Sequence, residues 1–153
     1  MKQISFLIWG SILLMIMASC GKDVNEPLAP DLARGVYFIH SQALFDVPSA
    51  ECGSRDGTLS VRAIEPVSGA HWEMLIRDKI PPGHYNFANI FNVSMIFRAY
   101  DGEEYYPVAG NFDLYELSVP DGRLKATFDC VLKSKRDGHI LQLRDGRVHV
   151  YFK

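Results

Sequence analysis

From Val36 onward, apolar and polar residues alternate along short segments that glycine, proline and aspartate separate. A period of two places every second side chain on one face of a β-strand, whereas an amphipathic helix needs a period near 3.6, which these segments do not show. The pattern therefore predicts an all-β chain. Ten strands are expected, at residues 36–45, 58–65, 71–77, 84–87, 92–100, 104–108, 112–119, 123–134, 139–144 and 147–152.

Three of the expected strands have a clear apolar face. The apolar residues are Leu59, Val61 and Ala63 in one strand, Trp72, Met74 and Ile76 in the next, and Val93, Met95, Phe97 and Ala99 in the third. Because alternate side chains of a strand share one face, these residues are expected to form the core. The predicted architecture is an antiparallel β-sandwich, with a barrel-like closed meander as the alternative.

Asp-Gly pairs are expected to form the turns between strands, because both central residues of a type I′ hairpin turn need positive φ. There are five such pairs, which begin at Asp56, Asp101, Asp121, Asp137 and Asp145. A two-residue turn at the last pair would place Leu143 opposite Val148 and Leu141 opposite Val150. Apolar residues would then face apolar residues, as a buried face requires.

The register at Asp121-Gly122 stays open. A two-residue turn would pair Val119 with Leu124. However, Pro120 has no N–H to donate and favours a type I turn with a bulge at Gly122. The sequence does not decide between these two turns.

The N-terminal segment has a different pattern, with Lys2 near its start and an uninterrupted apolar run at residues 12–17. The apolar region falls short of the roughly 20 residues that cross a bilayer and fits a cleaved signal peptide, so an uncleaved anchor is a less favoured alternative, as is an ordinary secretory signal. Met17-Ala18-Ser19-Cys20 resembles the lipobox of bacterial lipoproteins. The resemblance implies a signal peptide at residues 1–19 and lipidation of Cys20, and hence membrane attachment in the cell envelope.

Residues 20–33 are expected to form the lipidated cysteine and a flexible tether, because they contain two prolines and no strand or helix period. A single all-β domain is expected at residues 34–153. The Lys22-Asp23 pair partly resembles the export signal of Bacteroidetes surface lipoproteins. An outer-membrane lipoprotein is therefore expected, with the choice between its periplasmic and surface-exposed faces left open.

Composition excludes one class of partner. The chain has 16 Lys and Arg against 18 Asp and Glu, a formal net charge of −2, and no basic stripe. Nucleic-acid binding is not expected, because it needs clustered positive charge to neutralise phosphates.

Three cysteines are present, and lipidation of Cys20 would leave Cys52 and Cys130. In an oxidising compartment these two could form a disulfide. The alternative is two separate thiols, with Cys130 buried in a strand and Cys52 in a loop at residues 49–54. The sequence does not show whether their Cα atoms lie within the roughly 7 Å that a disulfide needs.

No catalytic or cofactor-binding motif is present, so neither an enzyme nor a bound cofactor is predicted. The histidines are expected at solvent-facing positions rather than as metal ligands, because none has a partner at ligand spacing. Asp101, Glu103 and Glu104 could coordinate Ca²⁺, but a hairpin tip usually leaves such carboxylates solvated. No metal site is therefore predicted. The histidines are His40, His71, His84, His139 and His149.

Four tyrosines near predicted turns are the candidate ligand-binding residues. Tyr85 follows the turn at residues 80–83, and Tyr100, Tyr105 and Tyr106 bracket Asp101-Gly102. Exposed tyrosines can stack on a sugar or anchor a protein partner, although core packing is the more common role of aromatic residues.

The last third of the chain resembles small Bacteroidetes lipoproteins of unknown function, at residues 110–114, 121–128 and 143–148. The resemblance implies an envelope location and a β architecture, and it implies no activity. The sequence thus predicts a non-catalytic binding or scaffolding module for a glycan or an envelope protein. The first alternative is a structural subunit of a fimbria-like assembly, in which a neighbour completes an edge strand. A hydrolase is less favoured.

Overall fold

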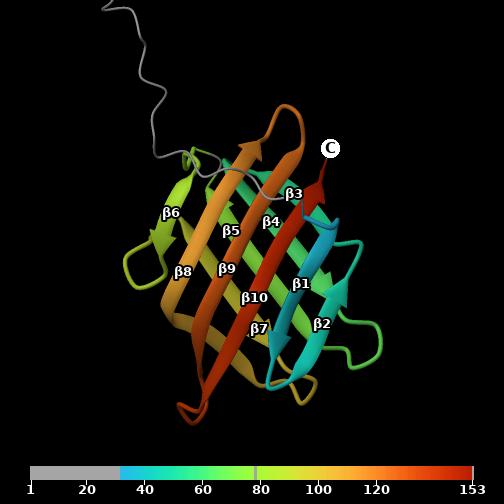
Figure 1. Cartoon of the computed structure of the whole chain (residues 1–153), viewed down its shortest axis with the longest axis vertical. Coiled ribbons are helices and arrows are strands. Elements are labelled where there is room, and N and C mark those ends of the chain that lie inside the picture. Colours follow the sequence, from blue (N-terminus) through green and yellow to red (C-terminus); the bar gives the residue numbers. More distant parts are fainter. Residues whose placement is uncertain (1–31, 78, 153) are drawn as a thin grey trace, which may run out of the picture.

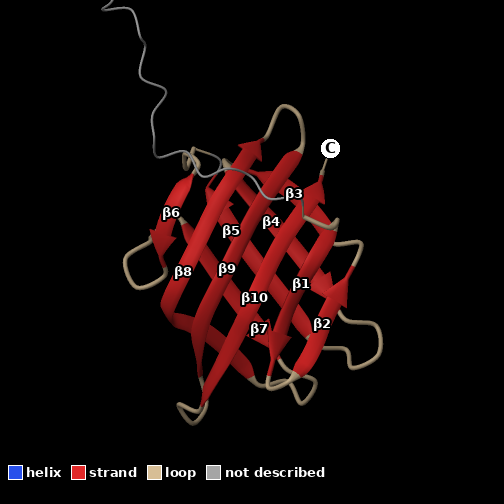
Figure 2. Ribbon diagram, in the orientation of Figure 1, coloured by secondary structure: helices blue, strands red, loops and turns tan. Residues whose placement is uncertain are grey.

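The computed structural model describes residues 32–77 and 79–152. It confirms the all-β prediction, because these residues form ten strands and their connections, with no helix among them (Figure 2). Within the same residues, no helix is long and apolar enough to cross a membrane. The strands are β1 (Gly35–His40), β2 (Ala43–Val47), β3 (Glu51–Arg55), β4 (Thr58–Ile64), β5 (His71–Arg77), β6 (Gly83–Asn86), β7 (Val93–Arg98), β8 (Glu104–Ser118), β9 (Arg123–Ser134) and β10 (Ile140–Tyr151).

The strands form one antiparallel sheet in the order β2-β1-β10-β9-β8-β7-β5-β4-β3, and β6 pairs with β8. The edge strands β2 and β3 are joined only by residues 48–50. Such a connection reaches about 14 Å at most, so the ends of the two edges must lie close together. The sheet therefore curls into a half-barrel, with β1, β8, β9 and β10 in front of β4, β5 and β7 (Figure 1).

The core lies inside this curl and contains the three predicted apolar faces. Nine of their ten residues are buried and Ala99 is half-buried. Trp72 of β5 stacks on Phe128 of β9, with ring centroids 5.8 Å apart, so the two walls of the curl meet through their largest side chains. Full burial of an apolar side chain such as Phe38 contributes roughly 1.5–3 kcal/mol.

The strand expected at residues 36–45 is in fact two strands, β1 and β2. They pair from Val36 with Val47 to His40 with Ala43. The two-residue turn between them consists of Ser41 and Gln42, at φ 44° and 69°. Neither residue is a usual choice for positive φ, which is why the sequence pattern did not reveal this hairpin.

The prediction of a loop at residues 49–54 is wrong, because β3 occupies residues 51–55. This edge strand is polar and mostly exposed on both faces, so no apolar alternation marks it. It forms a hairpin with β4 through Asp56-Gly57, which has φ values of 51° and 73° and pairs Arg55 with Thr58. The Asp-Gly turn predicted at this point is confirmed.

The two strands expected at residues 104–108 and 112–119 are one long strand, β8. Its register against β9 shifts between Pro107 and Ala109 and again between Leu114 and Glu116. Gly110, between the two shifts, has a φ of 119° and lies against the backbone of Asp129. These irregularities bend β8 and let it pair with β7 and β9 near its start and with β6 and β9 farther along.

The hairpin predicted at Asp145-Gly146 is also wrong, because these residues form a bulge within β10. Leu143 pairs with Cys130 of β9 and Val148 pairs with Ala126, so Leu143 and Val148 do not face each other. The long strand β9 offers partners to both halves of β10. The bulge accommodates one extra residue of β10 at Asp145, which has a φ of 54°. The N–H of Asp145 donates to Asp129 Oδ1 at 2.8 Å.

At Asp121-Gly122 the structure has the four-residue turn that Pro120 favours, and not the two-residue hairpin turn. The N–H of Gly122 donates to the carbonyl of Val119 at 3.2 Å, and Pro120 takes the second position of this turn. Ser118 then pairs with Arg123, so the register of a two-residue turn is not formed. The remaining Asp-Gly pairs, at residues 101–102 and 137–138, lie in turns as predicted.

The folded domain begins no later than Leu32, two residues before its predicted start. Leu32 is only 7% exposed, and its carbonyl accepts a hydrogen bond from His149 Nδ1 at 2.7 Å. The guanidinium of Arg34 lies 4.9 Å above the ring of Tyr151. The chain thus enters the domain beside the end of β10, whereas the predicted signal peptide, Cys20 and most of the predicted tether lie outside the described residues.

Candidate functional site

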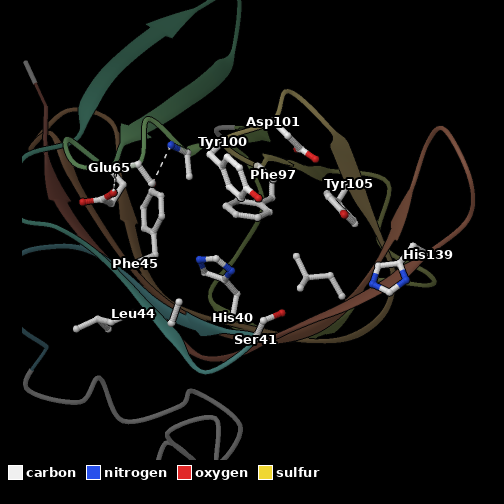
Figure 3. Close-up of a pocket in the computed structure, with 15 residues that line it drawn as sticks. His40, Ser41, Leu44, Phe45, Glu65, Phe97, Tyr100, Asp101, Tyr105 and His139 are labelled. Carbon is white, nitrogen blue, oxygen red and sulfur yellow. Dashed lines mark hydrogen bonds between the residues drawn. The ribbon is translucent and has the colours of Figure 1, made fainter.

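A cleft of about 480 Å³ opens at one end of the curled sheet. Its residues come from the β1–β2 hairpin, the β4–β5 loop, the β7–β8 connection and the start of β10 (Figure 3). β1 runs from the chain entry at Gly35 to His40, which lines the cleft, so the cleft and the entry lie at opposite ends of that strand. The volume lies within the range of small-molecule sites, which is about 300–1,000 Å³.

The floor of the cleft is apolar and belongs to the core. Phe45 and Phe97 are buried there, with ring centroids 6.3 Å apart and nearly perpendicular planes. The His40 ring lies 5.1 Å from the Phe97 ring. Burial lowers the pKa of His40. The neutral imidazole therefore adds a polar edge to an aromatic surface without adding charge at neutral pH.

Two of the four candidate tyrosines meet in this cleft. Tyr105 packs against Phe97, with ring centroids 6.3 Å apart, and Tyr100 stands beside it with 81% of its surface exposed. Tyr106 follows Tyr105 on β8 and lies instead in a shallow hollow with Ile96. Tyr85, on β6, donates its hydroxyl to the Pro81 carbonyl at 2.5 Å. The four tyrosines do not form one patch.

Two carboxylates at the rim are held by their own loops. The carboxylate of Glu65 accepts hydrogen bonds from the backbone N–H groups of Ser68 and Val67. These bonds lower the pKa of Glu65, and those from Ser68 have the larger effect. Asp101 Oδ1 accepts from the N–H of Glu103 at 3.0 Å. These bonds fix the directions of the carboxylates. The described residues that line the cleft include no lysine or arginine.

Glu103 is not solvated at a hairpin tip, as the sequence suggested, but buried with 5% of its surface exposed. Its carboxylate accepts from the Ser134 hydroxyl and pairs with Arg136 Nε at 2.8 Å. A buried carboxylate needs such partners. Glu103 thereby joins the β7–β8 connection to the β9–β10 turn, and both segments border the cleft.

The carboxylates weighed as a calcium site have other partners. Glu104 pairs with Arg98 at 2.6 Å and Lys135 at 3.5 Å, and hydrogen bonds from both cations lower its pKa. Among residues 32–77 and 79–152, no group of three or more histidine, cysteine, aspartate or glutamate side chains is placed to hold a metal ion.

The histidines do not all occupy solvent-facing positions. His40 and His139 line the cleft, and His149 binds the Leu32 carbonyl. His84 is exposed and pairs with Asp113 at 2.7 Å. His71 is half-buried, and its Nε2 atom has no hydrogen-bond partner among the described residues.

Cys52 and Cys130 are free thiols in this structure, on the edge strand β3 and the central strand β9. Burial raises the pKa of Cys52 to about 11 and raises that of Cys130 still further. Both thiols are therefore protonated at neutral pH and are weak nucleophiles. The burial predicted for Cys130 in a strand is confirmed.

We expect acid to destabilise the domain as the pH falls below 6.5, the usual histidine pKa. Burial lowers the pKa of His40, and burial together with the charge of Arg98 lowers that of His71. Each group binds a proton more readily when unfolded, so its contribution is complete above pH 6.5 and is lost as the pH falls through the folded pKa. Urea unfolding at several pH values measures this loss.

We assign the effect to these two histidines. A His40→Gln, His71→Gln double variant should therefore lose less stability between pH 7 and pH 5 than the parent. A double variant with the parent's full pH dependence would contradict the assignment.

The cleft combines an apolar aromatic floor, one exposed tyrosine and two acidic side chains at its rim, which suits the enclosure of a small ring-shaped ligand. The sequence identified Tyr100 and Tyr105, and it missed His40, Phe45, Glu65 and Phe97 as members of the same site. These residues are distant in the sequence, so no local pattern connects them. Comparison of the chain with models of protein families, with curated proteins and with solved structures finds no match in any of the three.

Proposed function

We propose that this chain is a lipid-anchored protein of the bacterial cell envelope that binds a glycan in the cleft and does not transform it. The observation that carries this proposal is the convergence of Phe97, Tyr100 and Tyr105 around one cavity of about 480 Å³. Sugar rings have an apolar face that packs on aromatic rings, and their hydroxyl groups can bond to polar groups at the rim.

Rigid walls support such a role, because a preformed site loses less entropy when its ligand binds. The Glu103–Arg136 ion pair fixes two of the segments that border the cleft. Glu65 fixes a third through its bonds to Val67 and Ser68. We also regard the curled sheet as a flattened sandwich rather than a closed barrel, because its edge strands β2 and β3 do not pair with each other.

The proposed membrane anchor is Cys20, and the tether at residues 20–33 would lead from it to the domain. Leu32 and Arg34 attach the incoming chain beside the end of β10. In the anchored protein the cleft would then lie at the far end of β1 from the attachment point. This arrangement favours a ligand that arrives from the aqueous side.

Replacement of Tyr100 by alanine should weaken glycan binding about tenfold, which corresponds to about 1.4 kcal/mol. Because Tyr100 is 81% exposed, the free energy of unfolding should change by less than about 0.5 kcal/mol. A glycan array identifies the ligand, and calorimetric titration measures the affinity of both proteins.

Phe91→Ala is the matched control for this substitution. Phe91 is 92% exposed and lies in the β6–β7 connection, outside the cleft. Its removal should leave the affinity unchanged. Equal losses in the two variants, or a ligand that binds Tyr100→Ala as tightly as the parent, would refute the cleft as the glycan site.

A structural subunit is the second candidate function. It is favoured by the two edge strands, since β2 and β3 each pair with only one neighbour among the described strands. Such an edge can accept a strand from another chain. Stable polymers or complexes with envelope proteins would support this function, whereas a monomer that captures no envelope protein would count against it.

A further inference from the structure

The carboxylate side chains that line the cleft have no basic counterpart in its described lining apart from the histidines His40 and His139. Glu65 and Asp101 border it, and its described lining contains no lysine or arginine. Figure 3 shows these two carboxylates on opposite sides of the aromatic group that includes Phe97 and Tyr100. A ligand seated on the aromatic rings would therefore have a carboxylate on either side.

Both carboxylates keep capacity for a ligand. A carboxylate has about four acceptor positions. Asp101 uses one for the Glu103 N–H, and Glu65 uses two for Val67 and Ser68. The hydrogen bonds to Glu65 also keep it ionised at neutral pH. The remaining positions can accept N–H donors from a bound molecule.

The aromatic side chains also favour a positively charged ligand. The face of a phenyl or phenol ring is electron-rich and attracts a cation within about 6 Å of its centre. Tyr100 and Tyr105 surround the cleft together with Phe97, and the neighbouring His40 is uncharged at neutral pH because burial lowers its pKa. An anionic group would meet no lysine or arginine among the described residues that line this cleft.

From this geometry we infer that the ligand carries a positively charged amine on its ring, as a sugar with a free amino group does. The inference rests on the proposed function and names its ligand class. The sugar ring would pack on the tyrosines, and the ammonium group would donate hydrogen bonds to Asp101 or Glu65. Neutral sugars would bind more weakly, and acidic or phosphorylated sugars would be rejected.

The test compares two ligands that differ at the amine. Oligosaccharides of β-1,4-linked glucosamine and their fully N-acetylated counterparts have the same ring and linkage, but only the former are cationic. The lipidated full chain, purified in a non-ionic detergent, is titrated with each by calorimetry at about pH 6, which lies below the usual pKa of sugar amines so that most of them are protonated. We expect at least tenfold tighter binding of the free-amine form, and a loss of this preference as salt is raised.

Two variants assign the preference to the rim. Asp101→Asn and Glu65→Gln each remove a charge and keep an oxygen that accepts a backbone N–H. Together they should abolish the preference for the free amine. Asp56→Asn, at the exposed β3–β4 turn, removes one charge outside the cleft and should preserve the preference.

Equal or tighter binding of the N-acetylated oligosaccharide would overturn the inference and leave the proposed function standing. The same holds if a glycan array shows only neutral or acidic glycans bound in a Tyr100-dependent way. If no glycan of any charge binds, both the inference and the proposed function fall.

Discussion

A Cys20→Ser substitution is expected to move the protein from the membrane fraction to the soluble fraction while the β domain stays folded. A buried acyl chain contributes about 0.8 kcal/mol per CH₂ group, so two or three chains hold a lipoprotein in the bilayer almost permanently. Serine cannot receive the thioether-linked lipid. The described domain offers little to replace it, because charged residues interrupt its exposed faces, among them Arg62, Arg98 and Lys125.

Membrane sedimentation measures the loss of attachment, and far-UV circular dichroism checks that the β domain remains folded. Cys52→Ser is the matched control, since Cys52 is a half-buried thiol on β3, and this variant should stay with the membrane. A retained signal peptide could hold Cys20→Ser at the membrane, so a chain that begins at residue 21 is tested beside it. If that chain still sediments after a high-salt wash, the lipid is not the anchor.

The buried faces could be predicted from the sequence because burial imposes alternation on a strand. Trp72, Met74 and Ile76 all point inward, and the polar or exposed residues between them point outward. An edge strand that is exposed on both faces does not need this alternation of apolar and polar residues. Most of β3 is exposed on both faces, so its composition resembles that of a loop, and only its pairing with β4 defines it as a strand.

Turns were harder to predict, because the Asp-Gly dipeptide occurs in different kinds of backbone structure. Asp56-Gly57 closes a hairpin, whereas Asp145-Gly146 forms a bulge inside β10. Both Asp56 and Asp145 adopt positive φ, so the local requirement is the same. The difference lies in β9, which is long enough to pair with both halves of β10, and no signal near Asp145 reports that partner.

The candidate site shows the same limit. Tyr100 and Tyr105 could be proposed because they flank a turn, but their partners His40 and Glu65 come from distant hairpins. The burial of Glu103 depends on Arg136, 33 residues farther along the chain. Such contacts follow from the curl of the sheet, which no local pattern determines.

A Gly146→Ala substitution is expected to lower the free energy of unfolding by about 2–3 kcal/mol, since overpacking a core commonly costs this much. A β-carbon at residue 146 would lie 2.4 Å from Cε2 of Phe128 and 2.5 Å from its carbonyl oxygen. Phe128 cannot withdraw easily, because it is stacked on Trp72 in the core. Urea unfolding should show the loss, and the melting temperature should fall by roughly 10 °C.

Gly53→Ala is the control, because a β-carbon there would meet no atom within 4 Å, and it should be nearly neutral. Similar stabilities for the two variants would show that the backbone at the β10 bulge shifts enough to accommodate the new methyl group.

A double-mutant cycle with Phe128→Leu separates the two clashes at Gly146. Leucine removes the aromatic edge that the new methyl group would meet, so the alanine should cost less in the Phe128→Leu background than in the parent. The relief should be partial, because the carbonyl oxygen of residue 128 stays 2.5 Å from the β-carbon position. Full relief would assign the whole requirement for glycine to the ring, and no relief would assign it to the pairing of the β9 and β10 backbones.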